Sequence, residues 1–151
     1  MKPEDAAMKY ALKLLTYRPR SVHELTVRLQ KKQFSEEVVA ETMARLIDWD
    51  YLNDEKFSDT WIQYRMLNKP MGAIRLKQEL REKGVPKEII NAKLEEAFSV
   101  NSEFDIARKL ANSKLNRSKN WPQVARMLIR RGFSYDTVEA VRESLGIGAD
   151  W

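Results

Sequence analysis

The sequence predicts an all-α fold made of three successive three-helix repeats. Apolar residues recur at intervals of three and four along the 151 residues, and no stretch alternates polar and apolar residues as a β-strand would. The same pattern returns 51 residues later without a gap. The matched pairs at this offset are Pro19 and Pro70, Leu25 and Leu76, Leu29 and Leu80, Lys32 and Lys83, and Glu37 and Glu88. Self-similarity at such a period is typical of arrays of small helical repeats.

The first repeat is predicted over residues 1–52 and contains three helices. An apolar stripe occupies residues 4–17, and Pro19 ends it because proline disfavours a helical residue before it. Ser21 begins the second helix, and Glu24 three residues later completes a capping box. Ser35 is placed to cap the third helix. The buried stripe of that helix is predicted at Val39, Met43, Leu46 and Ile47.

The second repeat is predicted over residues 53–100, and its first helix begins at Asn53 or Asp54. A Pro-Met-Gly break at residues 70–72 separates that helix from the next one. Met71 lies in this break and is the exception to the predicted core methionines, since an exposed methionine there could touch a partner. We also expect some of the aromatic residues near the boundary between the first two repeats to pack there. These residues are Trp49, Tyr51, Phe57 and Trp61.

The third repeat is predicted over residues 101–151, and it matches the second at an offset of 48, where Gly84 corresponds to Gly132. Its first helix is predicted over residues 103–115, Trp121 and Pro122 mark the start of the next, and the last spans about residues 135–145. The total is nine helices. Because three short helices bury little core by themselves, we expect neighbouring repeats to stack into an elongated, curved molecule.

Missing residue types and motifs exclude several chemistries. The chain has no cysteine and a single histidine, which rules out disulfides, thiolate catalysis and metal sites centred on cysteine or histidine. That residue, His23, is expected to be a surface or capping residue. Neither GxxxxGKS/T nor GxGxxG occurs, and a nucleophile triad has no supporting motif. We expect a protein that is not an enzyme, with no catalytic residue, no cofactor and no bound metal.

The chain carries no sign of export or membrane insertion. Its first residues are amphipathic and include acidic side chains, unlike a secretory signal peptide. No apolar run approaches the roughly 20 residues of a membrane-spanning helix. We therefore expect a cytoplasmic protein that contacts no membrane.

Charge is distributed unevenly along the chain, whose formal net charge is +5. Residues 33–60 contain eight acidic residues against two basic ones, whereas residues 106–133 contain eight basic residues and no acidic one. Long charged stretches are often only solvated helix faces. A stretch of 28 residues without a carboxylate favours instead a binding surface for an anionic partner.

Two groups of basic residues are candidate partner-binding surfaces, and both are predicted to meet acidic side chains or phosphate. The first surrounds a helix start in the second repeat, where free backbone N–H groups add to the positive charge. It consists of Arg65, Lys69, Arg75, Lys77 and Arg81. The second lies in the acid-free stretch of the third repeat. It consists of Lys114, Arg117, Lys119, Arg126, Arg130 and Arg131.

Four motifs, taken together, resemble those of the RecX family, the regulatory proteins of the RecA recombinase. They are Tyr17-Arg18-Pro19-Arg20-Ser21 with Glu24-Leu25; Tyr51-Leu52-Asn53-Asp54-Glu55-Lys56-Phe57; Ile74-Arg75 with Gln78-Glu79-Leu80-Arg81 and Lys83-Gly84-Val85; and Arg130-Arg131-Gly132-Phe133. The similarity covers nearly the whole length. Departures are modest, since the family commonly has glycine where Asp50 stands, Asp where Asn53 stands, and a glycine-rich basic turn at residues 68–72.

This resemblance implies tandem three-helix repeats that lie in the groove of the RecA filament on DNA. A protein bound there is expected to restrain, and in most of the family to inhibit, ATP hydrolysis, strand exchange and the filament's co-protease action on the LexA repressor. That role belongs to DNA repair, DNA recombination and the SOS response. The family role transfers most directly to Arg75, Arg81, Arg130 and Arg131, which lie within the matched motifs.

Two other functions remain open. The chain could instead be a helical protein that binds single- or double-stranded DNA directly through the basic third repeat, with an affinity that falls steeply as salt rises. A structural adaptor would bind neither the filament nor DNA. We expect a monomer, because the sequence shows no heptad seam and no additional apolar face.

Overall fold

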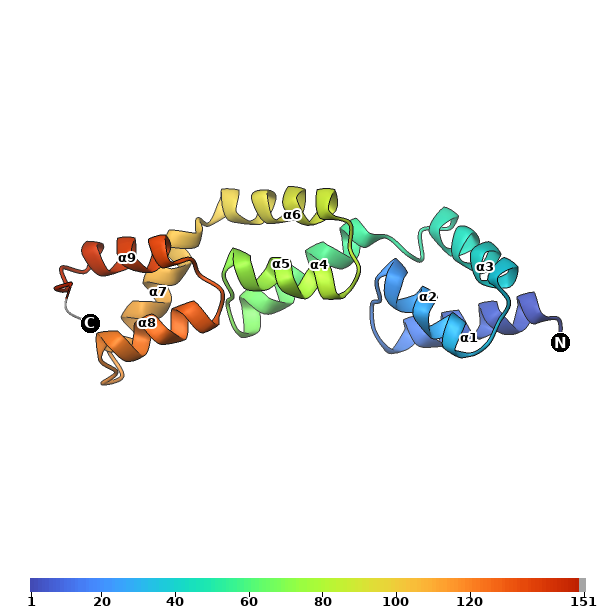
Figure 1. Ribbon diagram of the computed structural model, residues 1–151, viewed down its shortest axis with the longest axis horizontal. Coiled ribbons are helices and arrows are strands. Elements are labelled where there is room, and N and C mark those ends of the chain that lie inside the picture. The colour runs from blue at the N-terminus through green and yellow to red at the C-terminus, as the bar shows by residue number, and fades with distance from the viewer. Residues whose placement is uncertain (150–151) are drawn as a thin grey trace. The chain divides into compact units, whose positions relative to one another are not determined.

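The computed structural model of the protein describes residues 1–149 and consists of helices joined by short turns (Figure 1). In that range it contains nine helices and no strand, so the all-α prediction is confirmed. The helices are α1 (Pro3–Tyr17), α2 (Val22–Lys31), α3 (Glu36–Asp48), α4 (Asp54–Asn68), α5 (Ala73–Glu82), α6 (Lys87–Val100), α7 (Glu103–Leu115), α8 (Trp121–Arg130) and α9 (Tyr135–Ser144).

Polar side chains fix the starts of several helices, as the sequence predicts. Ser21 Oγ accepts a hydrogen bond from the Glu24 N–H at 3.0 Å, and the Glu24 carboxylate accepts one from the Ser21 N–H at 3.1 Å. These two bonds complete the predicted capping box of α2. Ser35 caps α3, and Asn53 accepts from two backbone N–H groups in the first turn of α4. Each such cap contributes about 1 kcal/mol to stability.

The chain divides into two compact units. The N-terminal unit contains Met1–Thr60 and Leu80–Ile90, and the C-terminal unit contains Trp61–Glu79 and Asn91–Trp151. Helices α4, α5 and α6 therefore each contribute residues to both units. The predicted repeat boundaries are not tested by this division and stay predictions, as does the expected elongated shape. Residues 150 and 151 of the predicted third repeat lie outside the described residues.

Small residues on α1 organise the core of the N-terminal unit. Ala7 and Ala11 are fully buried, so α1 packs closely on α2 and α3. The buried core consists of Ala7, Ala11, Leu14, Leu25, Leu29, Val38, Val39, Met43, Leu46 and Leu52. The predicted burial of Ile47 is wrong, since this residue is 48% exposed. The buried face of α3 is formed by Val38, Val39, Thr42, Met43 and Leu46, and at 100° per residue Ile47 lies about 40° beyond the edge of this face.

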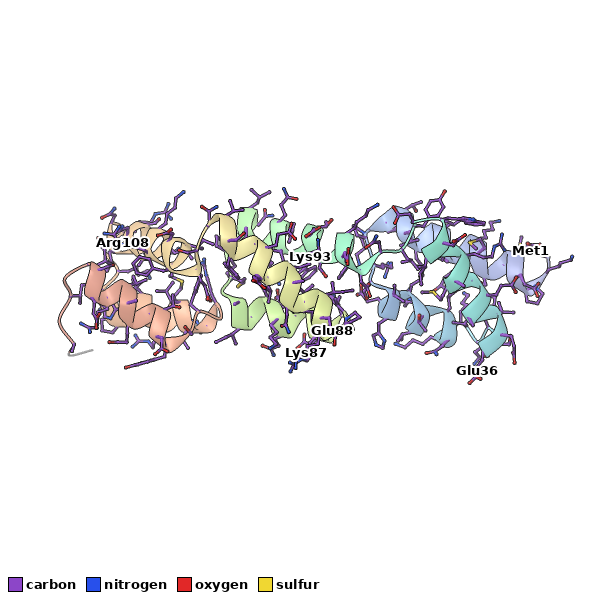
Figure 2. All side chains as sticks on the ribbon, turned by 90° about the horizontal axis from the view of Figure 1, so that it is seen from above. Met1, Glu36, Lys87, Glu88, Lys93 and Arg108 are labelled. Atoms are coloured by element: carbon purple, nitrogen blue, oxygen red, sulfur yellow. The ribbon has the colours of Figure 1, made fainter. Side chains whose placement is uncertain are left out.

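Ala107 and Ala111 have the corresponding position on α7 of the C-terminal unit. Both are fully buried, and α7 packs against α8 and α9. The buried core consists of Ala107, Ala111, Trp121, Val124, Ala125, Leu128, Phe133, Val138 and Val141. Arg108 is exposed on the outside of α7 (Figure 2).

The N-terminal unit contains a contact that we call the first joint, in which the start of α2 packs on the turn after α5. Ser21 Oγ donates a hydrogen bond to the Lys83 carbonyl at 2.5 Å. The Val22 N–H donates to the Asp54 carboxylate at 2.9 Å. Because the first N–H groups of a helix have no partner within the helix, the joint satisfies a donor that would otherwise need water.

The C-terminal unit contains a second joint, in which the start of α5 packs on the turn after α8. The Gly72 N–H donates to the Arg131 carbonyl at 2.7 Å. The Ala73 N–H donates to the Glu103 carboxylate at 2.9 Å. The second joint therefore repeats the arrangement of the first, with a carboxylate from a later helix on the start of α5.

Glycines allow the backbone to approach closely at both joints. Gly84, with φ +79°, packs on His23 in the first joint, and a Cβ there would overlap the His23 side chain. Gly132, with φ +87°, packs on Arg75 in the second joint, and a Cβ there would overlap the Arg75 backbone. Gly72 lies equally close to Gly132. Both positions need a residue that accepts a positive φ and has no Cβ, which explains why glycine occupies Gly84 and the matching position Gly132.

The second joint also explains the position of Met71. This side chain is 3% exposed, so the prediction that it is exposed is wrong. Gly72 holds the break at residues 70–72 against the turn after α8. Met71 is therefore enclosed in the C-terminal unit and does not face solvent.

Within residues 1–149, no helix combines the length and the apolar character that crossing a membrane requires.

Candidate functional site

A buried carboxylate organises several basic residues of the second repeat. Glu79 on α5 is 7% exposed, and Arg65 on α4 donates two hydrogen bonds to it, from Nε at 3.0 Å and from Nη2 at 2.6 Å. Trp61 Nε1 donates a third bond at 3.0 Å, and Arg75 Nε donates a fourth at 3.3 Å. Arg65 also lies over the Trp61 ring, with its guanidinium carbon 5.3 Å from the ring centroid. All four residues belong to the C-terminal unit.

These donors determine the charge state of Glu79. Burial would raise the pKa of this carboxyl, but the hydrogen bonds from Arg65 and Trp61 and the charge of Arg65 outweigh it, with a smaller contribution from Arg75. The pKa of Glu79 therefore lies below its ordinary value, and the group is ionised at neutral pH. Arg65 and Arg75 are engaged by an internal carboxylate, which makes them weaker candidates for an acidic partner than cations without a counter-ion.

The other three predicted basic residues of the second repeat have no ion-pair partner within the described residues. Lys69 and Arg81 are exposed, and Lys77 is half-buried. Lys69 and Lys77 belong to the C-terminal unit and Arg81 to the N-terminal unit. The predicted first group thus separates into an internally paired set, Arg65 and Arg75, and three free cations.

Four predicted basic residues of the third repeat line one hollow in the C-terminal unit, which we call the basic pocket. Lys114 comes from the end of α7, Lys119 from the turn that follows, and Arg126 and Arg130 from α8. The pocket has a volume of about 370 Å³. Its lining is completed by Gln123, Val124 and Met127.

The cations of the basic pocket have no carboxylate partner among the described residues. Gln123, Arg126 and Arg130 follow one another at intervals of three and four, so they share a face of α8. Hydrogen bonds between guanidinium or ammonium groups and an anion are roughly twice as strong as neutral ones. The pocket is therefore suited to bind phosphate or carboxylate groups.

The remaining two predicted residues of this group lie outside the pocket lining. Arg117 is exposed in the turn after α7. Arg131 is half-buried at the second joint, where its carbonyl accepts the hydrogen bond from Gly72. Burial lowers the pKa of Arg131, and the neighbouring charge of Arg130 lowers it further.

The described residues contain no group of three or more acidic or histidine side chains arranged to hold a metal ion. The single histidine, His23, is exposed in the first turn of α2.

Sequence reasoning missed two residues of these sites. Glu79 is an acidic residue in a basic segment, and its position four residues after Arg75 is the signal that points to their ion pair. Gln123 lines the basic pocket as a neutral residue. Its distance of three residues from Arg126 and seven from Arg130 would have placed it on the same face of the helix.

Comparison with known families identifies two successive domains of one family. The family model described as RecX, first three-helix domain, matches residues 7–46. The model described as RecX, second three-helix domain, matches residues 53–94.

Relatives from several bacteria align with most of the chain. Regulatory protein RecX of Mycobacterium sp. (strain KMS) is 36% identical over 141 residues, and the alignment covers 87% of this chain and 76% of the relative. Regulatory protein RecX of Mycolicibacterium smegmatis is 34% identical over 149 residues, with 89% and 79% covered. Regulatory protein RecX of Streptomyces coelicolor is 31% identical, with 95% and 79% covered.

A solved structure agrees with the fold. The crystal structure of RecX from Lactobacillus salivarius superimposes with a TM-score of 0.83 and covers 95% of this chain and 97% of its own. At 23% identity this likeness shows the fold alone. The family models and the sequence relatives carry the assignment. The chain therefore belongs to the RecX family, which consists of regulatory proteins and not of enzymes.

Proposed function

We propose that the chain regulates the RecA recombinase by binding in the groove of the RecA filament on DNA. Bound there, it inhibits ATP hydrolysis, strand exchange and the co-protease activity of the filament. The observation that carries this proposal is the family relationship, which extends over 87% of the chain at 36% identity to a protein named regulatory protein RecX.

The free cations of the C-terminal unit support a filament as the target. A nucleoprotein filament offers both acidic side chains and phosphates, and the basic pocket suits either group. Lys69 and Lys77 add further positive charge to the same unit. Arg75 is a poor position for testing these cations, because its reversal to Glu would place a like charge beside Glu79.

The direct test is the rate of ATP hydrolysis by RecA on single-stranded DNA while the chain is titrated in. DNA is kept in excess so that competition for it cannot limit the rate. We expect the rate to fall at concentrations of the chain below that of RecA subunits. An unchanged rate, under conditions where binding to the filament is saturated, would contradict the proposal.

A pair of matched variants tests the basic pocket in the same assay. Arg126→Glu with Arg130→Glu should raise the concentration needed for half-inhibition at least tenfold, because two charge-assisted contacts become repulsive. Lys87→Glu with Lys109→Glu changes the net charge equally at exposed positions outside the pocket. This control should shift inhibition by less than about threefold, since exposed charges away from a contact act weakly. Equal shifts for the two variants would remove the pocket from the proposal.

Direct DNA binding is the second candidate function, and the basic pocket is the observation that favours it. Four cations with no counter-ion around one hollow could track a phosphate backbone. If all four contact phosphates of duplex DNA, the logarithm of the binding constant should fall with that of the salt concentration at a slope of roughly −3 to −4. Fluorescence anisotropy with labelled DNA and no RecA measures this slope. Tight binding to bare DNA, together with no effect on filament ATP hydrolysis, would favour this second function.

A further inference from the structure

The N-terminal unit carries an acidic face that none of the functions above uses. Glu37, Glu41 and Asp48 lie on α3 at intervals of four and seven, with Ala44 between the last two, so the four residues form one stripe. All four are exposed, and within the described residues the three carboxylates have no ion-pair partner. Figure 2 shows Glu36, at the start of the same helix, pointing away from it. This acidic face is too negative to attract nucleic acid.

The basic residue of α3 does not neutralise this face. Arg45 lies with its guanidinium carbon 4.7 Å from the centroid of the Trp49 ring, which is a cation–π contact. The three carboxylates therefore remain available to an external cation.

The acidic face and the basic pocket have the same spacing when they are read in opposite directions. Along α3 the stripe advances by four, three and four residues, and from Arg130 back to Lys119 the pocket residues follow the same three intervals. The facing pairs would be Glu37 with Arg130, Glu41 with Arg126, Ala44 with Gln123, and Asp48 with Lys119. The α3 stripe spans about 16 Å and the part from Gln123 to Arg130 on α8 spans about 10 Å at a rise of 1.5 Å per residue, while Lys119 lines the same pocket from the turn before α8. An antiparallel pairing also places the positive end of one helix dipole beside the negative end of the other.

We propose that the acidic face of one copy binds the basic pocket of a second copy, so that neighbouring copies associate head to tail along the filament. This inference rests on the proposed function, because the filament supplies the regular array of neighbours. The contact joins two different surfaces, so each copy can bind one neighbour through its acidic face and another through its basic pocket. The charge match on this chain favours a second copy as the occupant, whereas a DNA backbone would account for the basic pocket only.

Exposed ion pairs are weak, so this contact affects copies bound side by side on the filament but not free copies in solution. Three such pairs strengthen association by about tenfold in all, which is too little to form a dimer at micromolar concentration in solution. Copies held side by side experience effective concentrations near the millimolar range, where a tenfold gain changes occupancy. The contact therefore produces cooperative loading of the filament by a chain that is monomeric in solution.

Cysteine crosslinking tests the contact directly, because the chain has no cysteine of its own. Ala44→Cys and Gln123→Cys replace the neutral pair at the centre of the match and keep all three charge pairs. Mixed on RecA filaments under mild oxidation, these two variants should form a disulfide-linked dimer about ten times faster than Ala44→Cys mixed with Ala92→Cys, an exposed control on α6. Equal rates would overturn the proposal.

The same comparison separates the inference from the function on which it rests. If the wild-type chain does not bind the filament, the proposed function fails, and the crosslinking is repeated without RecA at millimolar protein and low salt. The Ala44→Cys and Gln123→Cys pair should still react faster than the control pair there. If the chain binds the filament but the two pairs react equally, the proposed function stands and the head-to-tail contact is wrong.

Charge exchange distinguishes a second copy from DNA as the occupant of the basic pocket. Reversing Glu37, Glu41 and Asp48 to Arg should remove the cooperativity of filament binding, and so should reversing Lys119, Arg126 and Arg130 to Glu. Both reversals in one chain should restore the cooperativity, because each face again meets its opposite, although the affinity of a single copy for the filament stays weakened by the reversal of Arg126 and Arg130. Circular dichroism checks that each variant keeps its helicity. If a reversal unfolds the chain, the same residues are replaced by Gln, or by Asn at Asp48, and the loss of cooperativity is measured with these neutral variants. Failure of the combined variant to recover, with DNA binding lost, would assign the pocket to DNA and overturn the proposal.

Discussion

The two joints have similar backbone arrangements, but different groups form their hydrogen bonds. In the first joint, the residue before α2 is Ser21, whose hydroxyl accepts a hydrogen bond from α2 and donates one to the Lys83 carbonyl. In the second joint, Gly72 stands at the corresponding place before α5, and its backbone N–H donates to the Arg131 carbonyl. A side chain in one joint does what the backbone does in the other.

Both joints nevertheless use a carboxylate on a free N–H at a helix start. Asp54 is the first residue of α4 and accepts from α2, and Glu103 is the first residue of α7 and accepts from α5. The comparison shows that a side chain and a backbone group can replace each other as hydrogen-bond donors at a joint, as long as the free N–H groups at the helix start find an acceptor. Close approach of the backbone cannot be exchanged, which is why Gly84 and Gly132 occur in both.

Removing the close approach should have the largest effect. Gly132→Ala adds a Cβ that overlaps Arg75 in a backbone conformation with φ +87°, and we expect a loss of about 3 kcal/mol from overlap and conformation together. Gly146 is the matched control, because it has φ +69° and a Cβ added there would meet nothing within 4 Å. Gly146→Ala should cost only about 1 kcal/mol. Urea unfolding followed by circular dichroism measures both, and equal losses would show that space at the second joint is unimportant.

Glu79 should give the next largest effect, and it should depend on pH. Glu79→Gln removes the charge that Arg65, Arg75 and Trp61 bond, at an expected cost of about 2 kcal/mol at pH 7. Because the pKa of Glu79 is lowered in the folded chain, its contribution is present above the pKa of the unfolded state and is lost as pH falls through the folded value. The difference between wild type and variant in urea unfolding should therefore shrink in acid. A difference independent of pH would contradict the ion-pair account.

Asp54 should behave in the opposite way at the first joint. Burial raises the pKa of this carboxyl, and the negative charge of Glu24 raises it further. The hydrogen bond from the Val22 N–H and the charge of His23 lower the pKa, but by less. A raised pKa gives a contribution that is present below the unfolded pKa and lost as pH rises through the folded one. Asp54→Asn keeps an acceptor for Val22 and should be more stable than wild type by about 0.5–1 kcal/mol at pH 7, with the advantage disappearing in acid. Thermal unfolding at both pH values measures it, and an acid-stable advantage would refute the assignment.

The smallest effect concerns a position equivalent to the joint glycines. Gln33 corresponds to Gly84 and Gly132 at the repeat offsets and has φ +68°, but it is exposed and carries a side chain. Gln33→Gly relieves the left-handed strain at some cost in chain entropy, so we expect a gain of about 0.5 kcal/mol. Urea unfolding decides the sign. A loss of stability would mean that the Gln33 side chain makes a contact of its own.

Local features of the fold were predictable from sequence. The capping box of Ser21 and Glu24 and the span of α7 over residues 103–115 follow from residues close together in the chain. Asp50, which stands where the resemblance to the family implies a glycine, has φ +61°. Such features depend on residues that are neighbours in the chain, so the local sequence pattern predicts them.

Features that depend on distant residues were predictable only in part. Met71 is buried because Gly72 bonds Arg131, which lies far away in sequence. Of the aromatic residues expected to pack near the first repeat boundary, Phe57 is buried, whereas Trp49 and Tyr51 are 48% and 59% exposed. Their rings pair edge to face with centroids 6.5 Å apart. Periodicity shows which face of a helix is apolar but not which neighbour covers it.

The candidate site shows the same limit. Composition identified the basic residues, because an acid-free stretch is visible in the sequence. It could not show that Glu79 engages both Arg65 and Arg75, since the contact with Arg65 joins two helices. Nor could it show that Arg131 is partly buried while Arg130 lines the basic pocket.

Binding of the chain to RecA filaments tests the central claim most directly. The chain is labelled at Ala92→Cys, and its fluorescence anisotropy is followed with RecA filaments on single-stranded DNA and with the same DNA alone. We expect binding to the filament to be at least tenfold tighter than binding to bare DNA, and to weaken when Arg126 and Arg130 are reversed to Glu. Equal affinity for filament and bare DNA would contradict the account and leave a DNA-binding protein in its place.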